Sequence, residues 1–196
     1  MVRKKSLIIA WFAKGKENTM PLIDILNPDI IDLEVKGNTK DEVLRYMARD
    51  LYDNGYINDV DQFVSDIYVR EAEGPTGMGS HISIPHGKSE SVQKIGICIG
   101  RTLNPVKWET GMTEDGWQDT RLIFLFCVSA DAEFATNHMM LLSELAGKLG
   151  NDARVARLAD ATTKQEVIDL ILCDESELEG TELKDTEEIV DLDIDF

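Results

Sequence analysis

Cysteine is scarce in this sequence, and its placement excludes the chemistry that cysteine pairs support. The three cysteines, Cys98, Cys127 and Cys173, are far apart, and none forms the C-x-x-C spacing of a metal or redox site. Cys98 and Cys127 lie inside apolar runs, where a reduced cysteine packs as a small hydrophobic residue. We therefore expect buried, free thiols at these two positions.

Long apolar runs and an excess of positive charge are also missing. No run approaches the roughly 18 apolar residues that a transmembrane helix needs. The formal net charge of −17 argues against a nucleic-acid-binding protein, because such a protein needs basic patches to bind phosphates. The chain has 196 residues, of which 43% are hydrophobic and 29% are charged. This composition is typical of a globular protein with one domain that buries a core.

The charge is distributed unevenly, and this predicts three segments. Residues 1–19 carry five basic residues against one acidic residue. The apolar stretch at residues 7–13 is short for a signal peptide and is followed by lysines instead of a cleavage site, so we interpret the segment as a basic N-terminal extension. Residues 174–196 carry eleven acidic residues against Lys184, which is typical of a solvated tail or linker. The folded domain is expected over residues 20–173.

Helical and strand patterns alternate within that domain. A Thr39-x-x-Glu42 capping box begins the first helix, which ends at Asp53-Asn54-Gly55. A near-continuous apolar run over residues 122–128 is typical of a strand covered on both faces. Alternating strands and helices indicate an α/β fold with both faces of the sheet covered. The other expected helices cover residues 60–72, 134–150, 155–159 and 164–172; the other expected strands cover residues 81–84 and 95–101, and residues 103–116 are rich in turn residues.

The best candidate for a functional site is the stretch of residues 74–88, G-P-T-G-M-G-S-H-I-S-I-P-H-G-K. Its first half contains glycines and a proline that exclude a regular helix. Residues 81–84 alternate like a short, half-buried strand, and Pro85 ends that pattern. His86 is then expected at the end of the strand, where Gly87 would let a partner approach the imidazole closely. Histidine suits reversible chemistry near neutral pH, although a single histidine after a proline is often an ordinary loop residue.

Several pieces of the sequence, in a fixed order, resemble a known family. They are Arg70-Glu71, Gly74-x-Thr76-Gly77-x-Gly79, Ile84-Pro85-His86-Gly87-Lys88, Pro105-Val106-x-Trp108, the apolar run at 122–128, and His138-x-x-Leu141-Leu142-Ser143-x-Leu145-Ala146. Together they resemble the enzyme IIA domain of the phosphoenolpyruvate-dependent sugar phosphotransferase system, in its fructose/mannitol class. The resemblance extends over residues 21–172.

This resemblance implies a fold and a function. The fold would be a single α/β domain with a mixed sheet of about five strands between helices. His86 would accept a phosphoryl group from the phosphocarrier HPr and pass it to a cysteine of an enzyme IIB component, for sugar uptake. His138 would be the second histidine of the site and Arg70 its arginine. The family implies a cytoplasmic protein that needs no metal or other cofactor, binds no nucleic acid, and meets the membrane only through the sugar permease.

The chemistry of these residues agrees with that role. A neutral imidazole nitrogen is a good nucleophile, and after protonation of its other nitrogen it is a good leaving group. Arg70 offers a forked donor to phosphate oxygens, although a cation in the last turn of a helix also has a purely structural explanation. His138, near the start of a helix, is expected to hydrogen-bond to the phosphoryl group, which the helix N-terminus would favour.

Alternatives remain open at this point. The family includes regulatory members of nitrogen metabolism, which carry the same histidine and act by phosphorylation-dependent partner binding. A zinc site built from His81, His86 and His138 is a more remote alternative. His81 and Ser83 depart from the family pattern, and no enzyme IIB signature follows in this chain. We interpret His81 as a surface or strand-end residue.

Overall fold

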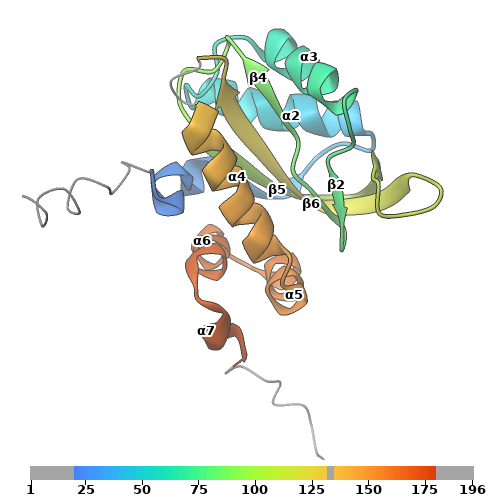
Figure 1. The fold of residues 1–196 in the computed structure, drawn as a ribbon, viewed down its shortest axis with the longest axis vertical. Helices are drawn as coiled ribbons and strands as arrows, with labels where there is room; N and C mark the ends of the chain where they lie inside the picture. Colours follow the sequence, from blue (N-terminus) through green and yellow to red (C-terminus); the bar gives the residue numbers. More distant parts are fainter. Residues whose placement is uncertain (1–19, 132–134, 180–196) are drawn as a thin grey trace, which may run out of the picture.

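A six-stranded mixed sheet lies at the centre of the molecule (Figure 1). The computed structural model describes residues 20–131 and 135–179. The strands are β1 (Ile31–Val35), β2 (Gly77–Gly79), β3 (Ile82–Ser83), β4 (His86–Ser89), β5 (Gly96–Glu109) and β6 (Trp117–Ser129). The helices are η1 (Leu22–Ile25), η2 (Pro28–Ile30), α2 (Lys40–Asp53), α3 (Val60–Glu71), α4 (Ala135–Leu149), α5 (Asp152–Asp160), α6 (Lys164–Leu172) and α7 (Glu175–Glu179).

The strand order makes β6 the strand on which the site is built. The order is β1-β5-β6-β3-β2, and β4 also pairs with β6, beyond the end of β3. Strands β3 and β4 run parallel to β6, whereas β5 is antiparallel to it. The prediction of a mixed sheet between helices is confirmed, with six strands where about five were expected.

The apolar run at residues 122–128 is buried on both faces, as predicted. Ile123, Leu125 and Cys127 pack in the cluster formed with α2 and α3. The residues between them, such as Phe124 and Phe126, pack in the cluster that contains α4, α5 and α6. The thiols of Cys98 and Cys127 are free and buried, which confirms the expectation for both.

Side chains cap several helices, and the cap at Thr39 is the predicted one. Thr39 accepts a hydrogen bond from the backbone N–H of Glu42 at the start of α2, 3.2 Å away. Thr163 does the same for Glu166 at the start of α6, at 3.1 Å. Asp59 begins α3, which ends at Glu71 and so brings Arg70 into its last turn. These caps satisfy backbone donors that a helix N-terminus leaves without partners.

The sequence interpretation of residues 103–116 is wrong for its first half. Strand β5 continues to Glu109, which pairs with Trp117 of β6. The register shifts between Arg101 and Val106, and this irregularity accommodates Pro105, which has no N–H to give to a ladder. The local pattern of turn residues therefore did not predict the long β5–β6 hairpin.

The predicted termini lie largely outside the described residues. Residues 1–19 do so entirely, and so does the acidic segment from residue 180 onwards. Before that point α7 contributes Leu178, which is 5% exposed, to the main core cluster. Within the described part of the chain, no helix has the length and apolar character needed to cross a bilayer.

Candidate functional site

A cavity of about 390 Å³ lies between α3, β4 and α4. The three predicted site residues, His86, Arg70 and His138, all line it, together with Lys88. They come from three elements that are far apart in the sequence, and the packing of α3 and α4 against the β4–β6 ladder brings them together. The sequence prediction that these three side chains share one site agrees with this arrangement.

His86 is the first residue of β4, and not the last residue of the preceding strand as predicted. Its partner in the ladder is Phe126 of β6, whose N–H also donates to the carbonyl of Pro85 at 3.0 Å. Pro85 has no N–H, so pairing with β6 is interrupted after β3 and resumes at His86. The histidine is therefore held by a backbone ladder on its C-terminal side.

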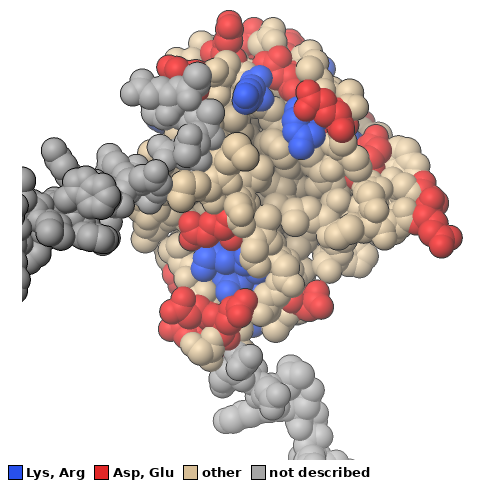
Figure 2. Space-filling view, in the orientation of Figure 1, with Lys and Arg blue, Asp and Glu red and all other residues tan. Residues whose placement is uncertain are grey.

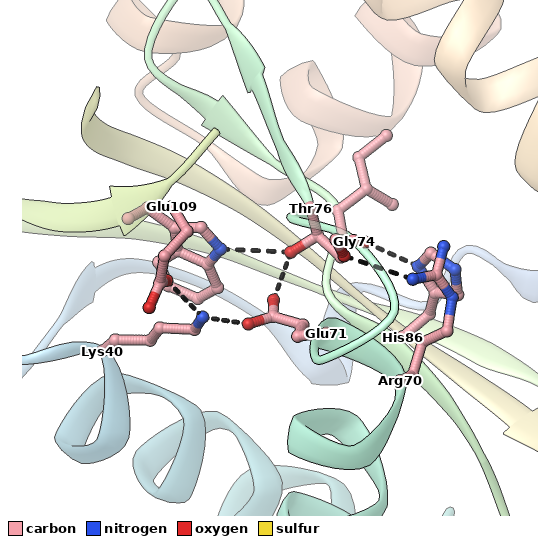
Figure 3. Close-up of polar contacts among 9 residues, drawn as sticks. Lys40, Arg70, Glu71, Gly74, Thr76, His86 and Glu109 are labelled. Atoms are coloured by element: carbon pink, nitrogen blue, oxygen red, sulfur yellow. Dashed lines mark hydrogen bonds and ion pairs between the residues drawn. The ribbon is translucent and has the colours of Figure 1, made fainter. Parts of the chain in front are cut away.

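The hydrogen bond of His86 defines which ring nitrogen carries the hydrogen. Its Nδ1 lies 2.8 Å from the carbonyl oxygen of Ile84 (Figure 3). A carbonyl oxygen only accepts, so Nδ1 carries the hydrogen and Nε2 keeps its lone pair. The pKa of His86 is lowered, and burial is the largest cause. The hydrogen bond to the Ile84 carbonyl opposes this effect, the charge of Arg70 lowers the pKa further, and Glu71 has the smallest, raising effect. The imidazole is thus held in its neutral, nucleophilic form.

Gly87 is required for a different reason from the one predicted. A Cβ at this position would lie 2.6 Å from the backbone oxygen of Asp66 and 2.9 Å from the nitrogen of Ile67. The missing side chain therefore makes room for the backbone of α3, and not for a partner at the imidazole. The close contact of β4 with α3 fixes His86 relative to Arg70.

Replacing Gly87 with alanine is expected to destabilise the fold by about 1–3 kcal/mol, because the new methyl group meets backbone atoms that cannot move independently. Chemical denaturation with urea measures this change. Gly111→Ala is the matched control, since a Cβ there meets nothing within 4 Å. Equal stability of the two variants would show that the α3–β4 contact is looser than described.

Arg70 lies in the last turn of α3 and reaches the loop that follows. One of its terminal nitrogens donates to the carbonyl of Gly74 at 3.2 Å (Figure 3). The guanidinium has five N–H donors, so this bond orients it and leaves others for a ligand. The structural explanation of Arg70 and its predicted role at the site are therefore compatible.

His138 is buried in the cavity wall without a partner. It is 4% exposed, and neither ring nitrogen has a hydrogen-bond partner within residues 20–131 and 135–179. The pKa of His138 is lowered, mainly by burial and to a smaller extent by the charge of Lys88. A buried polar group without a partner is costly, so His138 is suited to bind a polar group that enters the cavity.

Sequence reasoning gave no role to Lys88, although this side chain lines the cavity. Residues two apart on a strand point to the same face, so His86-x-Lys88 would have indicated the role if the strand had been expected to begin at His86. Two exposed apolar side chains, Val69 at 65% and Met139 at 74% exposure, also line the cavity. Met139 shares helical spacing with buried residues of α4 but faces outwards.

His81 lies away from this site. Its Nδ1 is 2.6 Å from the carbonyl oxygen of Asp119, the side chain is exposed, and its φ is +62°. Within the described ranges, no three or more His, Cys, Asp or Glu side chains gather closely enough to hold a metal ion. The set of His81, His86 and His138 that was considered for zinc is therefore not brought together.

The sequence matches the family described as "Phosphoenolpyruvate-dependent sugar phosphotransferase system, EIIA 2" over residues 24–173. It is 30% identical over 149 residues to the PTS system 2-O-alpha-mannosyl-D-glycerate-specific EIIABC component of Escherichia coli, covering 76% of this chain and 22% of that protein. It is 28% identical to the PTS system fructose-specific EIIA component of Haloferax volcanii, over 73% of this chain and 89% of that one. The chain thus spans about a fifth of the first relative and most of the second.

Solved structures agree with this comparison. The nitrogen regulatory protein IIA-Ntr of Neisseria meningitidis is 25% identical and superposes with a TM-score of 0.66, over 76% of this chain and 98% of that one. The enzyme IIA-Mtl in the complex with phosphorylated enzyme IIB-Mtl from Escherichia coli is 26% identical, with a TM-score of 0.60, over 74% of this chain and 96% of that one. The chain therefore belongs to the EIIA family of the phosphoenolpyruvate-dependent sugar phosphotransferase system, in its fructose/mannitol class.

Proposed function

We propose that this protein is a cytoplasmic phosphoryl carrier of a sugar phosphotransferase system and that His86 is the residue that carries the group. The observation that supports this most is the state of His86. Its Nδ1–H donates to the Ile84 carbonyl, which leaves Nε2 free beside a cavity that Arg70, Lys88 and His138 also line. A neutral nucleophile among cations and an unpartnered buried histidine suits a phosphoryl group.

The transfer reaction needs only the residues of this site. The Nε2 lone pair of His86 attacks the phosphorus of a donor phosphohistidine, and the electron pair of the breaking P–N bond returns to the donor imidazole. The Nδ1–H remains on the ring and, through its bond to the Ile84 carbonyl, stabilises the positive charge that develops there. Arg70 and Lys88 balance the negative charge of the phosphoryl oxygens, and such transfers depend mainly on positioning and on charge neutralisation.

The second half of the reaction returns His86 to its original state. The thiolate of an acceptor cysteine attacks the same phosphorus, a P–S bond forms, and the P–N bond to His86 breaks. We propose phosphorylated HPr as the donor and the cysteine of an enzyme IIB component as the acceptor. The complex of enzyme IIA-Mtl with phosphorylated enzyme IIB-Mtl supports the second partner, since that IIA protein is similar to this chain.

The surface around the cavity suits brief contacts with two different proteins. Val69 and Met139 present exposed apolar area beside the reactive histidine. On the face drawn in Figure 2, much of the middle is uncharged, and basic and acidic side chains lie next to one another above and below it. Asp66 and Glu73 add acidic groups to the lining of the cavity. Transient complexes commonly combine a small apolar contact with complementary charges at its rim, so we expect partner surfaces with basic margins.

A regulatory role is the second candidate, and the likeness to the nitrogen regulatory protein IIA-Ntr of Neisseria meningitidis favours it. Such a protein would use the same His86 chemistry in the first half of the reaction. It would then act through phosphorylation-dependent partner binding, without passing the group to an enzyme IIB cysteine. The two candidates therefore differ in the second transfer step.

One experiment tests both steps. The protein is incubated with labelled phosphoenolpyruvate, enzyme I and HPr, and we expect one acid-labile phosphoryl group per chain. The phosphorylated protein is then isolated and mixed with fructose/mannitol-class enzyme IIB domains. Loss of the label to an enzyme IIB cysteine supports the carrier, whereas a label that stays on the protein with every such domain favours the regulatory role. Absence of any label would contradict both.

A further inference from the structure

A buried ion pair lies behind the cavity, at the end of α3. The Nζ of Lys40 contacts the Glu71 carboxylate and lies 2.6 Å from Oε2 of Glu109. The side chains of Lys40 and Glu71 are only 11% and 6% exposed. The ammonium group also lies 4.9 Å from the centre of the Trp108 ring. Buried ion pairs are often retained for the arrangement they impose and not for the stability they add.

The other oxygen of Glu71 fixes the hydroxyl group of Thr76. The Thr76 hydroxyl donates to Oε1 of Glu71 and accepts from the indole N–H of Trp108, 3.1 Å away (Figure 3). A hydroxyl has a single hydrogen, so these two bonds define one orientation. Thr76 is 6% exposed, which leaves water little access to replace either bond. Glu71 therefore holds Thr76 in one orientation within the loop that follows α3.

Two backbone steps connect Thr76 to the reactive histidine. The carbonyl oxygen of Thr76 accepts from the N–H of Ile84 at 3.0 Å. The carbonyl oxygen of Ile84 accepts from Nδ1 of His86 at 2.8 Å. Thus the same residue, Ile84, is bonded on one side to the loop and on the other to the imidazole. Arg70 bonds to Gly74 of this loop, so neighbouring residues of α3 hold the loop at two points.

We propose that Glu71 and Thr76 are positioning residues for His86. By holding the N–H of Ile84, they fix the backbone of this residue and keep its carbonyl oxygen aimed at Nδ1, and this selects the tautomer whose Nε2 is the nucleophile. Lys40 keeps the Glu71 carboxylate in place. This inference rests on the proposed phosphoryl transfer only for its effect on rate, because the tautomer of His86 exists without any partner.

The test removes one hydroxyl group and reads the state of the histidine directly. Thr76→Val keeps the shape of the side chain but cannot bond to Glu71 or Trp108. In the unphosphorylated protein, the ¹⁵N chemical shifts of the His86 ring are expected to change from a single Nδ1–H tautomer to a mixture. Transfer from phosphorylated HPr should slow by about 10-fold, the low end of the effect seen when the hydrogen bonds that orient metal-bound histidines are lost. Thr76→Ser should restore both.

Thr102→Val is the matched control. Thr102 of β5 is also buried, and its hydroxyl donates to the carbonyl of Arg121 at 3.5 Å, not to the loop, Ile84 or His86. This variant should change neither the tautomer nor the transfer rate. An unchanged tautomer in folded Thr76→Val, or an equal change in Thr102→Val, would overturn the proposal.

Glu71→Gln provides a second route if Thr76→Val does not fold. The amide can still accept from Thr76 but no longer neutralises Lys40, so the hold on Thr76 weakens while the volume is kept. The expected result is again a mixed tautomer and slower transfer, and a pure Nδ1–H tautomer with an unchanged rate would contradict the inference. If no variant or wild-type protein is phosphorylated, the proposed function fails, yet the ¹⁵N shifts still decide the positioning role.

Discussion

His86→Ala is expected to abolish phosphorylation of this protein by phosphoenolpyruvate, enzyme I and HPr. The imidazole is the bond-forming group of the proposed transfer, so no residual rate is expected from charge or positioning alone. His81→Ala is the matched control, because His81 lies in the same stretch of sequence but is exposed and hydrogen-bonded to the Asp119 backbone. The measurement is the acid-labile label bound per chain after incubation.

Comparing the two histidine variants distinguishes a specific effect of His86 from a general effect of a substitution in the same stretch of sequence. We expect full labelling of His81→Ala and none of His86→Ala, with the folded state of each confirmed by urea denaturation. Undiminished labelling of His86→Ala would mean that another residue accepts the group, and the proposed function would then have to be rebuilt around that residue.

Arg70→Ala is expected to slow phosphoryl transfer by about 10²-fold, the typical cost of losing one positioned charge-stabilising donor. His138→Ala should slow it similarly, because His138 is the buried group without a partner in the cavity wall. The charge of Arg70 also lowers the pKa of His86, so Arg70→Ala should raise that pKa. Single-turnover transfer from phosphorylated HPr measures the rates, and an NMR titration of His86 measures the pKa.

Arg49→Ala controls for the loss of an arginine elsewhere. Arg49 lies on α2, where its guanidinium is 5.4 Å from the centre of the Tyr52 ring, outside the cavity. It should transfer at the wild-type rate and leave the pKa of His86 unchanged. If Arg70→Ala and His138→Ala also transfer at the wild-type rate, these two residues do not act on the phosphoryl group.

The local pattern and the family resemblance predicted different parts of the molecule. The apolar run at 122–128 indicated a strand covered on both faces, whereas the resemblance assigned His86, Arg70 and His138 to one site, and the structure places these three side chains around one cavity. The continuation of β5 past Pro105 was not predictable, because the hydrogen bonds that sustain it come from β6 and not from the local sequence.

The roles of some residues also depend on partners that are far away in the sequence. Gly87 looked like an opening for another protein, yet it is the backbone of α3 that occupies the space beside it. Thr76 was part of the family motif but had no predicted role of its own, and the role we propose for it depends on its hydrogen bonds with Glu71 and Trp108 in the fold. Periodicity and spacing predict single helices and strands. They do not predict these contacts, which join elements that are far apart in the sequence.

The close packing at Gly87 has a consequence for a protein that meets two partners in succession. Because α3 and β4 touch through backbone atoms at Gly87, we expect the backbones of Arg70 and His86 to move together. A partner that pressed on the outer face of α3 would displace both together and leave the distance between guanidinium and imidazole unchanged. Donor and acceptor can therefore dock at different angles and still meet the same chemical geometry. The adaptation required by two unlike surfaces would then fall on exposed side chains such as Val69 and Met139, whose rotamers can change without moving the backbone.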